Sequence, residues 1–133
     1  MSDPTGPKTI LIIDDDPDYR DPLAVVLGAA GYRVRCACDG DQGLAMAREE
    51  PPDLILLDFI MPAKDGFEVT HEIRQQTALR KVPVIALTAF GRDIGEIHGL
   101  PRDQALASIH DFLEKPVDPN VLLDRIAGAI AAR

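Results

Sequence analysis

Basic residues and long apolar runs are scarce in this chain of 133 residues. Lys and Arg together number 14 against 22 Asp and Glu, which gives a formal net charge of -8 at pH 7. An acidic surface repels a phosphate backbone, so we expect no direct binding to nucleic acid. No apolar stretch approaches the roughly 20 residues that a helix needs to cross a bilayer, so we expect no membrane insertion.

Cysteine is also scarce, and the start of the chain lacks the features of a signal peptide. The two cysteines, Cys36 and Cys38, are too few to complete a metal site. They lie two residues apart in a segment that alternates polar and apolar side chains, so we expect buried structural thiols on one face of a strand. The first residues carry neither a basic nor an apolar region, which favours a cytoplasmic location. The length predicts one domain, without room for a separate output domain.

Two stretches of consecutive aliphatic residues end on carboxylates. Residues 9–13, which are aliphatic from Ile10 onward, are followed by Asp14, Asp15 and Asp16, and residues 54–57 are followed by Asp58. Apolar runs without polar alternation are typical of strands that are buried on both faces, as in a parallel sheet. Because ligands of open α/β sheets bind at the carboxyl ends of the strands, these acids are candidate functional residues.

The remaining pattern alternates strands with helices. Further strands are expected at residues 33–38, 82–87 and 109–113, and helices at about 17–30, 42–50, 67–77 and from 118 or 119 onward. Asp16 before Pro17 is a typical N-cap and first turn. Glycines and a proline interrupt residues 90–108, so a fourth helix in that segment is expected to be irregular.

This alternation predicts parallel strands with helices on both faces of the sheet. We expect an α/β fold, namely a flavodoxin-like, doubly wound five-stranded parallel sheet in the order 2-1-3-4-5 with five helices. The domain would span residues 8–133, after a flexible N-terminal tail of residues 1–7. One edge of the sheet would then carry Asp14, Asp15, Asp58, Thr88 and Lys115.

Three carboxylates at one sheet edge repel each other unless a cation joins them. Mg²⁺ is the usual hard divalent ion where phosphate is also bound, because it accepts few carboxylates and keeps water and phosphate oxygens as ligands. Lys115 would add a positive charge for a phosphoryl oxygen or for Asp58, and Thr88 would offer a hydroxyl. An Asp with such neighbours is able to attack phosphorus and form an acyl phosphate.

Four segments, in this order, resemble the receiver domain of two-component response regulators: ILIIDDDPDYR, PDLILLDFIMPAKDGFEV, PVIALTAFG and DFLEKP. The resemblance covers the chain from about Lys8 to Arg133. It implies a stand-alone receiver in a phosphorelay, which takes a phosphoryl group on Asp58 from a histidine kinase or a histidine phosphotransfer protein. The phosphorylated receiver would then switch its binding to a downstream protein. Such a chain is a phosphoacceptor switch, with only Mg-dependent self-phosphorylation and self-dephosphorylation, and is expected to be a monomer or weak homodimer.

The resemblance also implies a set of metal ligands. Asp15 and Asp58 would hold Mg²⁺ directly, and Asp14 would hold it through water. The backbone carbonyl of Ile60 would be a further ligand. Asp16 is expected to act only as the cap of the following helix.

The same resemblance assigns the residues of the switch. Thr88 would move toward the phosphate and Lys115 would pair with it, while Phe112 would take the place of the aromatic switch residue. The Lys115–Pro116 peptide bond is expected to be cis. The apolar side chains of Ile60 and Phe90 would hinder an attacking water, which predicts slow self-dephosphorylation.

Two alternatives from other functional classes stay open. One is a Mg²⁺-dependent phosphatase of the haloacid-dehalogenase kind, whose Asp-x-Asp pair Asp14 and Asp16 could mimic, although the short chain and the Asp58 strand argue against it. The other is a receiver fold that serves as a phosphorylation-independent interaction module, against which the intact set of acids weighs. The three histidines lie in no phosphotransfer context and are expected to be surface or structural residues: His71, His98 and His110.

Overall fold

A computed structural model describes residues 6–59, 61, 66–88 and 109–132. Five parallel strands form one sheet in the order β2-β1-β3-β4-β5, which confirms the predicted fold class and strand order. The strands are β1 (Thr9–Ile13), β2 (Arg33–Ala37), β3 (Leu54–Asp58), β4 (Val84–Thr88) and β5 (Asp111–Glu114). The two unbroken aliphatic runs are thus the neighbouring strands β1 and β3.

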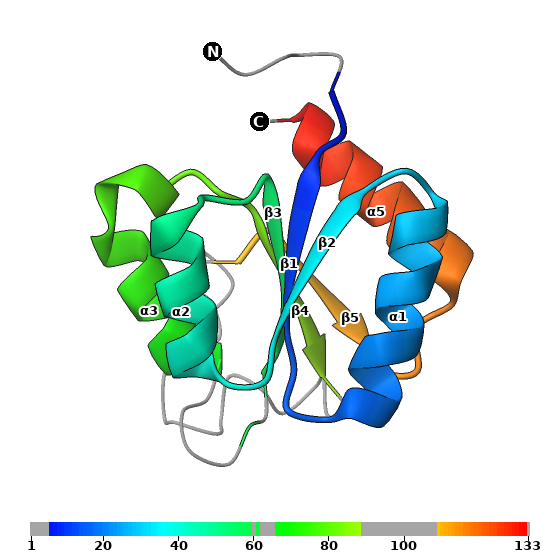
Figure 1. The fold of residues 1–133 in the computed structure, drawn as a ribbon, viewed down its shortest axis with the longest axis horizontal. Helices are drawn as coiled ribbons and strands as arrows, with labels where there is room; N and C mark the ends of the chain where they lie inside the picture. The colour runs from blue at the N-terminus through cyan, green and yellow to red at the C-terminus, as the bar shows by residue number, and fades with distance from the viewer. Residues whose placement is uncertain (1–5, 60, 62–65, 89–108, 133) are drawn as a thin grey trace.

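Helices cover both faces of the sheet (Figure 1). Helices α1 (Pro17–Ala29) and α5 (Pro119–Ala131) lie on one face, and α2 (Gly40–Glu49) and α3 (Gly66–Gln75) lie on the other. A short 3-10 helix, η1 (Thr77–Leu79), follows α3. The fourth helix that the sequence predicts falls in residues 89–108, outside the described part of the chain. No helix among the described residues is both long and apolar enough to span a membrane.

The core has one layer on each side of the sheet, and this explains the composition of the central strands. Leu11 and Ile13 pack toward α2 and α3, whereas Ile10 and Ile12 pack toward α1 and α5. Every residue of β1, β3 and β4 is buried. Because burial of one large aliphatic side chain stabilises the fold by about 1.5–3 kcal/mol, a polar residue inside these strands would be costly. Polar side chains are therefore placed at the strand ends.

Local hydrogen bonds shift several element boundaries from those expected. Helix α2 begins at Gly40 because the Asp39 carboxylate caps it by accepting the backbone N–H of Gln42 at 2.7 Å. Strand β4 begins at Val84 because the N–H of Val82 donates to the carbonyl of Leu79, which keeps Val82 in the preceding turn. Strand β5 likewise begins at Asp111, two residues after the expected start.

Strand β2 lies at the edge of the sheet, and the prediction of two buried thiols is wrong for Cys38. Cys36 is partly buried against the layer that contains α1 and α5, whereas Cys38 is exposed. The reason is that β2 ends at Ala37, so Cys38 belongs to the turn that leads into α2, where its N–H donates to Oε1 of Gln42. Both thiols are free.

Candidate functional site

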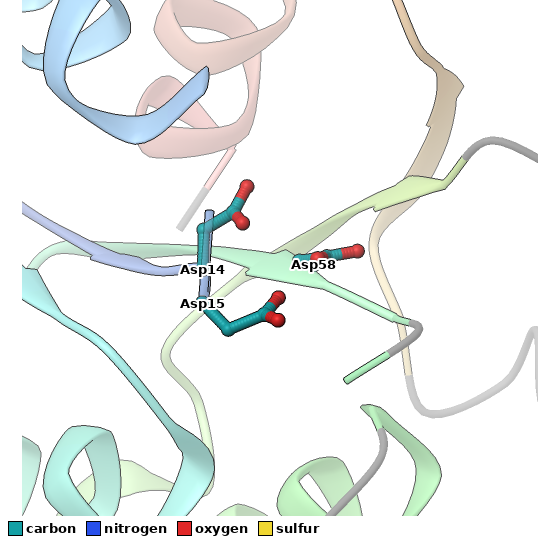
Figure 2. A group of neighbouring side chains, drawn as sticks. All are labelled: Asp14, Asp15 and Asp58. Carbon is teal, nitrogen blue, oxygen red and sulfur yellow. The ribbon is translucent and has the colours of Figure 1, made fainter. Parts of the chain in front are cut away.

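Three carboxylates meet at the carboxyl edge of the sheet (Figure 2). Asp14 and Asp15 directly follow β1, and Asp58 is the last residue of β3. One oxygen from each carboxylate lies within 4.8 Å of the other two. Asp14 and Asp58 are 1% and 7% exposed, whereas Asp15 is open to solvent. Two of the three charges are thus removed from bulk water, and their mutual repulsion is stronger there than it would be in water.

Lys115 brings a positive charge to this cluster from the end of β5. Its Nζ lies 3.1 Å from Oδ2 of Asp14 and 3.5 Å from Oδ2 of Asp58. Burial by itself would lower the pKa of Lys115, but the Asp58 charge and the charge and hydrogen bond of Asp14 outweigh it and raise the pKa above its ordinary value. The side chain is therefore an ammonium ion at neutral pH. The Lys115–Pro116 peptide bond is cis, as expected.

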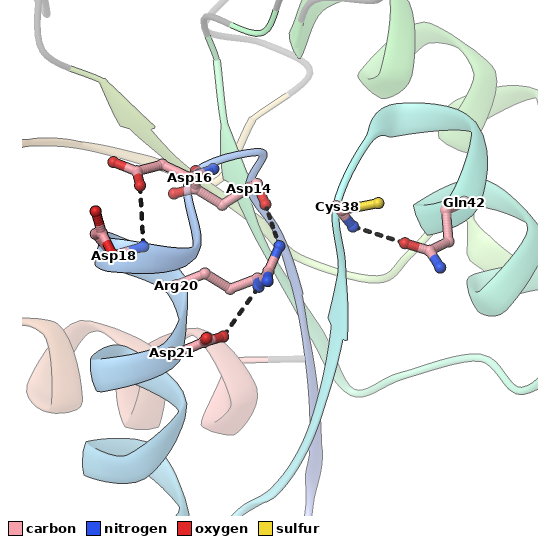
Figure 3. Close-up of polar contacts among 7 residues, drawn as sticks. All are labelled: Asp14, Asp16, Asp18, Arg20, Asp21, Cys38 and Gln42. Atoms are coloured by element: carbon pink, nitrogen blue, oxygen red, sulfur yellow. Dashed lines mark hydrogen bonds and ion pairs between the residues drawn. The ribbon is translucent and has the colours of Figure 1, made fainter.

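Backbone contacts hold the loop between β1 and α1 that presents the acids. The Asp14 N–H donates to the carbonyl of Ala37 at 3.1 Å, and Oδ1 of Asp14 accepts the N–H of Asp16 at 2.9 Å. Arg20 donates from Nη1 to the Asp14 carbonyl at 3.0 Å (Figure 3). Asp16 caps α1 by accepting the N–H of Asp18, as the sequence predicts. The acidic loop is thus anchored on both β2 and α1.

Thr88 and Phe112 lie on the two strands beyond Asp58. Thr88 ends β4 and is fully buried, and its neighbour Leu87 is in register with Asp58. The Phe112 ring packs edge-to-face on Phe59, with ring centroids 5.5 Å apart. Phe59 directly follows Asp58 in the chain. The Phe112 ring therefore contacts the residue next to an acid of the cluster. In this structure Phe112 is also a partly buried member of the core layer next to α3.

Some of the predicted residues lie outside the described part of the chain. Ile60 and Phe90 lie outside the described residues, as does His98; His71 and His110 are exposed.

Sequence reasoning missed two residues at the site: Tyr19, whose ring faces the Lys115 ammonium, and Arg20, which donates to the Asp14 carbonyl. Helical side chains tilt toward the N-terminus of their helix, so the first turns of a helix that follows an acidic run are where such contacts should be sought.

The donor set fits a hard divalent cation. Three carboxylates and one ammonium leave an excess of two negative charges when all four are ionised. Each carboxylate supplies oxygen, the ligand that Mg²⁺ prefers, and the exposed side of Asp15 leaves room for water ligands. Among the described residues, this is the group of acids close enough to share an ion.

Residues 10–127 match the family described as the response regulator receiver domain. The chain belongs to this family. Receiver domains are phosphoacceptor switches of two-component signal transduction, and they accept phosphoryl groups from histidine kinases. The acid cluster described above therefore lies in a receiver fold.

Individual relatives differ in how much of their length this receiver covers. Protein PilH of Pseudomonas aeruginosa is 34% identical over 122 residues, which cover 92% of this chain and 97% of PilH. RpaA, a DNA-binding dual master transcriptional regulator of Synechocystis, is 40% identical over 117 residues, which cover 88% of this chain and 46% of RpaA. The receiver spans about half the length of RpaA and of several other curated relatives.

A solved structure of a relative contains the expected metal. The receiver domain of the sensor histidine kinase PA1611 from Pseudomonas aeruginosa is 32% identical and superposes with a TM-score of 0.79. The match covers 95% of this chain and 99% of that one. That structure has a magnesium ion coordinated in its active site cleft.

Proposed function

We propose that this receiver takes a phosphoryl group on Asp58 from a histidine kinase or a histidine phosphotransfer protein, and that phosphorylation switches its binding to a downstream protein. One observation carries the proposal. The Asp58 carboxylate ends a central strand, within reach of two further carboxylates and of the Lys115 ammonium. This arrangement combines a nucleophile with the charges that phosphoryl transfer needs.

In the proposed reaction, an oxygen of Asp58 attacks the phosphorus of a phosphohistidine. The new O–P bond forms as the P–N bond breaks, and the imidazole leaves with the electron pair of that bond and takes up a proton. The product is an acyl phosphate on Asp58. Lys115, which lies 3.5 Å from the carboxylate, is placed to stabilise the negative charge on a phosphoryl oxygen.

The acids that surround Asp58 would hold the metal. We assign Asp15 and Asp58 as direct ligands of Mg²⁺ and Asp14 as a ligand through water, with the Ile60 carbonyl as a further ligand. When bound, the ion supplies positive charge that offsets the phosphoryl oxygens and the three carboxylates. The separation of at most 4.8 Å between one oxygen of each of the three carboxylates supports an ion shared by these acids.

Thr88 and Phe112 would change position in response to phosphorylation. The phosphoryl group adds a dianion beside Lys115 and near the end of β4, where the Thr88 hydroxyl would hydrogen-bond it. The N–H of Lys115 donates to the carbonyl of Thr88 at 2.8 Å, and Lys115 directly follows β5, the strand that carries Phe112. Movement at Thr88 would therefore be passed to β5 and alter the packing of Phe112. Such a shift biases a two-state equilibrium and thereby changes the surface offered to a partner.

The test is phosphorylation of the purified protein by a small phosphodonor, phosphoramidate, in the presence of Mg²⁺. The parent should gain one phosphoryl group by intact mass, and Asp58→Asn should gain none because the nucleophilic oxygen is lost. Asp124→Asn removes an exposed carboxylate on α5 and should label like the parent. Equal labelling of Asp58→Asn would contradict the assignment of Asp58. A parent that is never labelled would favour the phosphorylation-independent interaction module.

A further inference from the structure

Tyr19, in the first turn of α1, contacts the Lys115 ammonium together with Asp14 and Asp58. The two carboxylates of Asp14 and Asp58 bind the ammonium from the sheet, and the Tyr19 ring covers it from the helix, with Nζ 4.3 Å from the ring centroid. We propose that Tyr19 is a positioning residue that holds Lys115 in place for phosphoryl transfer to Asp58. The inference rests on the proposed function and adds a residue to its machinery.

The contact is one that physical chemistry favours. A cation over the face of an aromatic ring and within about 6 Å of its centroid is attracted by the ring quadrupole, more strongly where water is excluded. The Lys115 side chain is only 17% exposed. A lysine side chain has many rotamers and a compact charge, so its position depends on the groups that surround it. Without the ring, the α1 side of the ammonium would be open to water.

The ring is itself held in place. Tyr19 is partly buried against the core layer next to α1 and α5, and it lines a surface hollow with Pro22, Leu23 and Val117. Its backbone N–H donates to the carbonyl of Asp16, the residue that caps α1. The turn that presents the acids therefore also fixes the aromatic ring.

The ring face confines the ammonium without accepting a strong hydrogen bond. This matters because Lys115 has to exchange its contact with the Asp58 carboxylate for one with a phosphoryl oxygen. A carboxylate in place of the ring would compete for the N–H groups, whereas an aromatic face leaves them free to turn. Because the Tyr19 ring lies against Lys115 and does not belong to the group of acids that could share an ion, loss of the ring should slow the transfer and leave Mg²⁺ affinity nearly unchanged.

The experiment measures the rate of Asp58 phosphorylation by phosphoramidate at saturating Mg²⁺. Tyr19→Leu should react roughly 3- to 10-fold more slowly than the parent, the range expected for a partly desolvated cation–π contact. Tyr19→Phe keeps the ring and should stay within about twofold of the parent. The dissociation constant for Mg²⁺ should change by less than about twofold in both variants. In a Lys115→Met background, Tyr19→Leu should cause no further loss, because the partner of the ring is absent.

Each outcome decides between this proposal and another explanation. Equal rates for the parent and Tyr19→Leu would overturn it, and so would an undiminished loss in the Lys115→Met background, which would indicate a structural role. A second measurement uses the unmodified protein: the ε-methylene protons of Lys115 should be shifted upfield by the ring current of Tyr19. Unshifted resonances would overturn the proposal even if Tyr19→Leu failed to fold. Absence of labelling in the parent with a shifted Lys115 would instead contradict the proposed function alone.

Discussion

At the scale of residues, Lys115 is shared between two acids and lies nearer to Asp14 than to Asp58, at 3.1 and 3.5 Å. Asp14 is the more deeply buried of the two acids. A buried carboxylate without a partner is costly, so Lys115 stabilises the end of β1 as well as the candidate phosphoacceptor. The lysine therefore has a structural contact to keep while its contact with Asp58 changes.

The two cysteines should differ in reactivity toward iodoacetamide. Burial raises the pKa of the Cys36 thiol, with a smaller lowering by Arg20 and a smaller rise from Asp21. Less thiolate is then available at pH 8, whereas Cys38 is exposed. We expect mass spectrometry to show Cys38 modified first. The rate of Cys36 modification should keep rising as the pH passes the ordinary pKa of a thiol, because the pKa of Cys36 is raised.

The time course of modification should have a fast and a slow phase, and single substitutions assign each phase to one cysteine. Cys38→Ser should leave only the slow phase and Cys36→Ser only the fast one. The reverse assignment, or equal rates for both thiols, would contradict the burial that the structure gives them.

At the scale of elements, the register between β1 and β3 decides which acids meet. Ile13 is paired with Leu57, so the next positions along the two strands are Asp14 and Asp58. A slip of one residue would turn the side chains of a strand to the opposite face and separate the carboxylates. The aliphatic residues on both faces of β1 and β3 thus keep the site assembled as well as filling the core.

Glycines in two helices should respond to alanine with opposite signs. In α2, a Cβ on Gly43 would lie 2.6 Å from Cγ1 of Ile13, so we expect Gly43→Ala to destabilise the fold by about 1–3 kcal/mol. In α5, a Cβ on Gly128 would meet nothing within 4 Å. Gly128→Ala should therefore stabilise the fold by about 0.5–1 kcal/mol, because alanine loses less entropy in a helix.

Urea unfolding monitored by circular dichroism would test both values. A destabilised Gly128→Ala or a stabilised Gly43→Ala would show that the packing of α2 or α5 differs from that described. Because Ile13 directly precedes Asp14, the Gly43 contact also connects α2 to the base of the acid cluster.

At the scale of the whole molecule, the sheet gathers side chains that are far apart in the sequence. Lys115 and Asp14 are separated by 101 residues and are joined by a contact of 3.1 Å. Their strands are not neighbours, since β3 and β4 lie between them in the sheet. The charges of the site are therefore brought together only when β1, β3, β4 and β5 have paired, and ligands of the site should stabilise the fold as a whole.

Mg²⁺ should raise the unfolding temperature of the parent. A ligand that binds only the folded state stabilises it by about 2.7 kcal/mol at 100 times its dissociation constant. Asp15→Asn removes one of three mutually repelling carboxylates, so it should unfold at a higher temperature than the parent in EDTA and gain less from Mg²⁺. Thermal scans with and without Mg²⁺ would measure both effects.

Asp124→Asn is the matched control, because it removes the same charge from an exposed position on α5. Its response to Mg²⁺ should equal that of the parent. An unfolding temperature of the parent that does not depend on Mg²⁺ would contradict the metal assignment.

Much of this protein is determined by its sequence alone. The aliphatic runs before Asp14 and Asp58 predict β1 and β3 because only a strand covered on both faces buries so many consecutive side chains. The alternation with helices then predicts a parallel sheet, whose carboxyl edge collects the strand-end acids. Asp16 as a helix cap was also predictable, because capping depends only on neighbouring residues.

Only the tertiary structure decided the contacts that depend on packing between distant elements. The exposure of Cys38 follows from where β2 ends, and β2 ends where its pairing with β1 stops, at Ile13 and Ala37. The placement of Tyr19 over Lys115 requires α1 and the end of β5 to lie side by side. Local patterns determine which face of an element is buried, because burial follows periodicity. They do not determine which side chain of another element lies opposite, because that depends on register and helix position across the whole sheet.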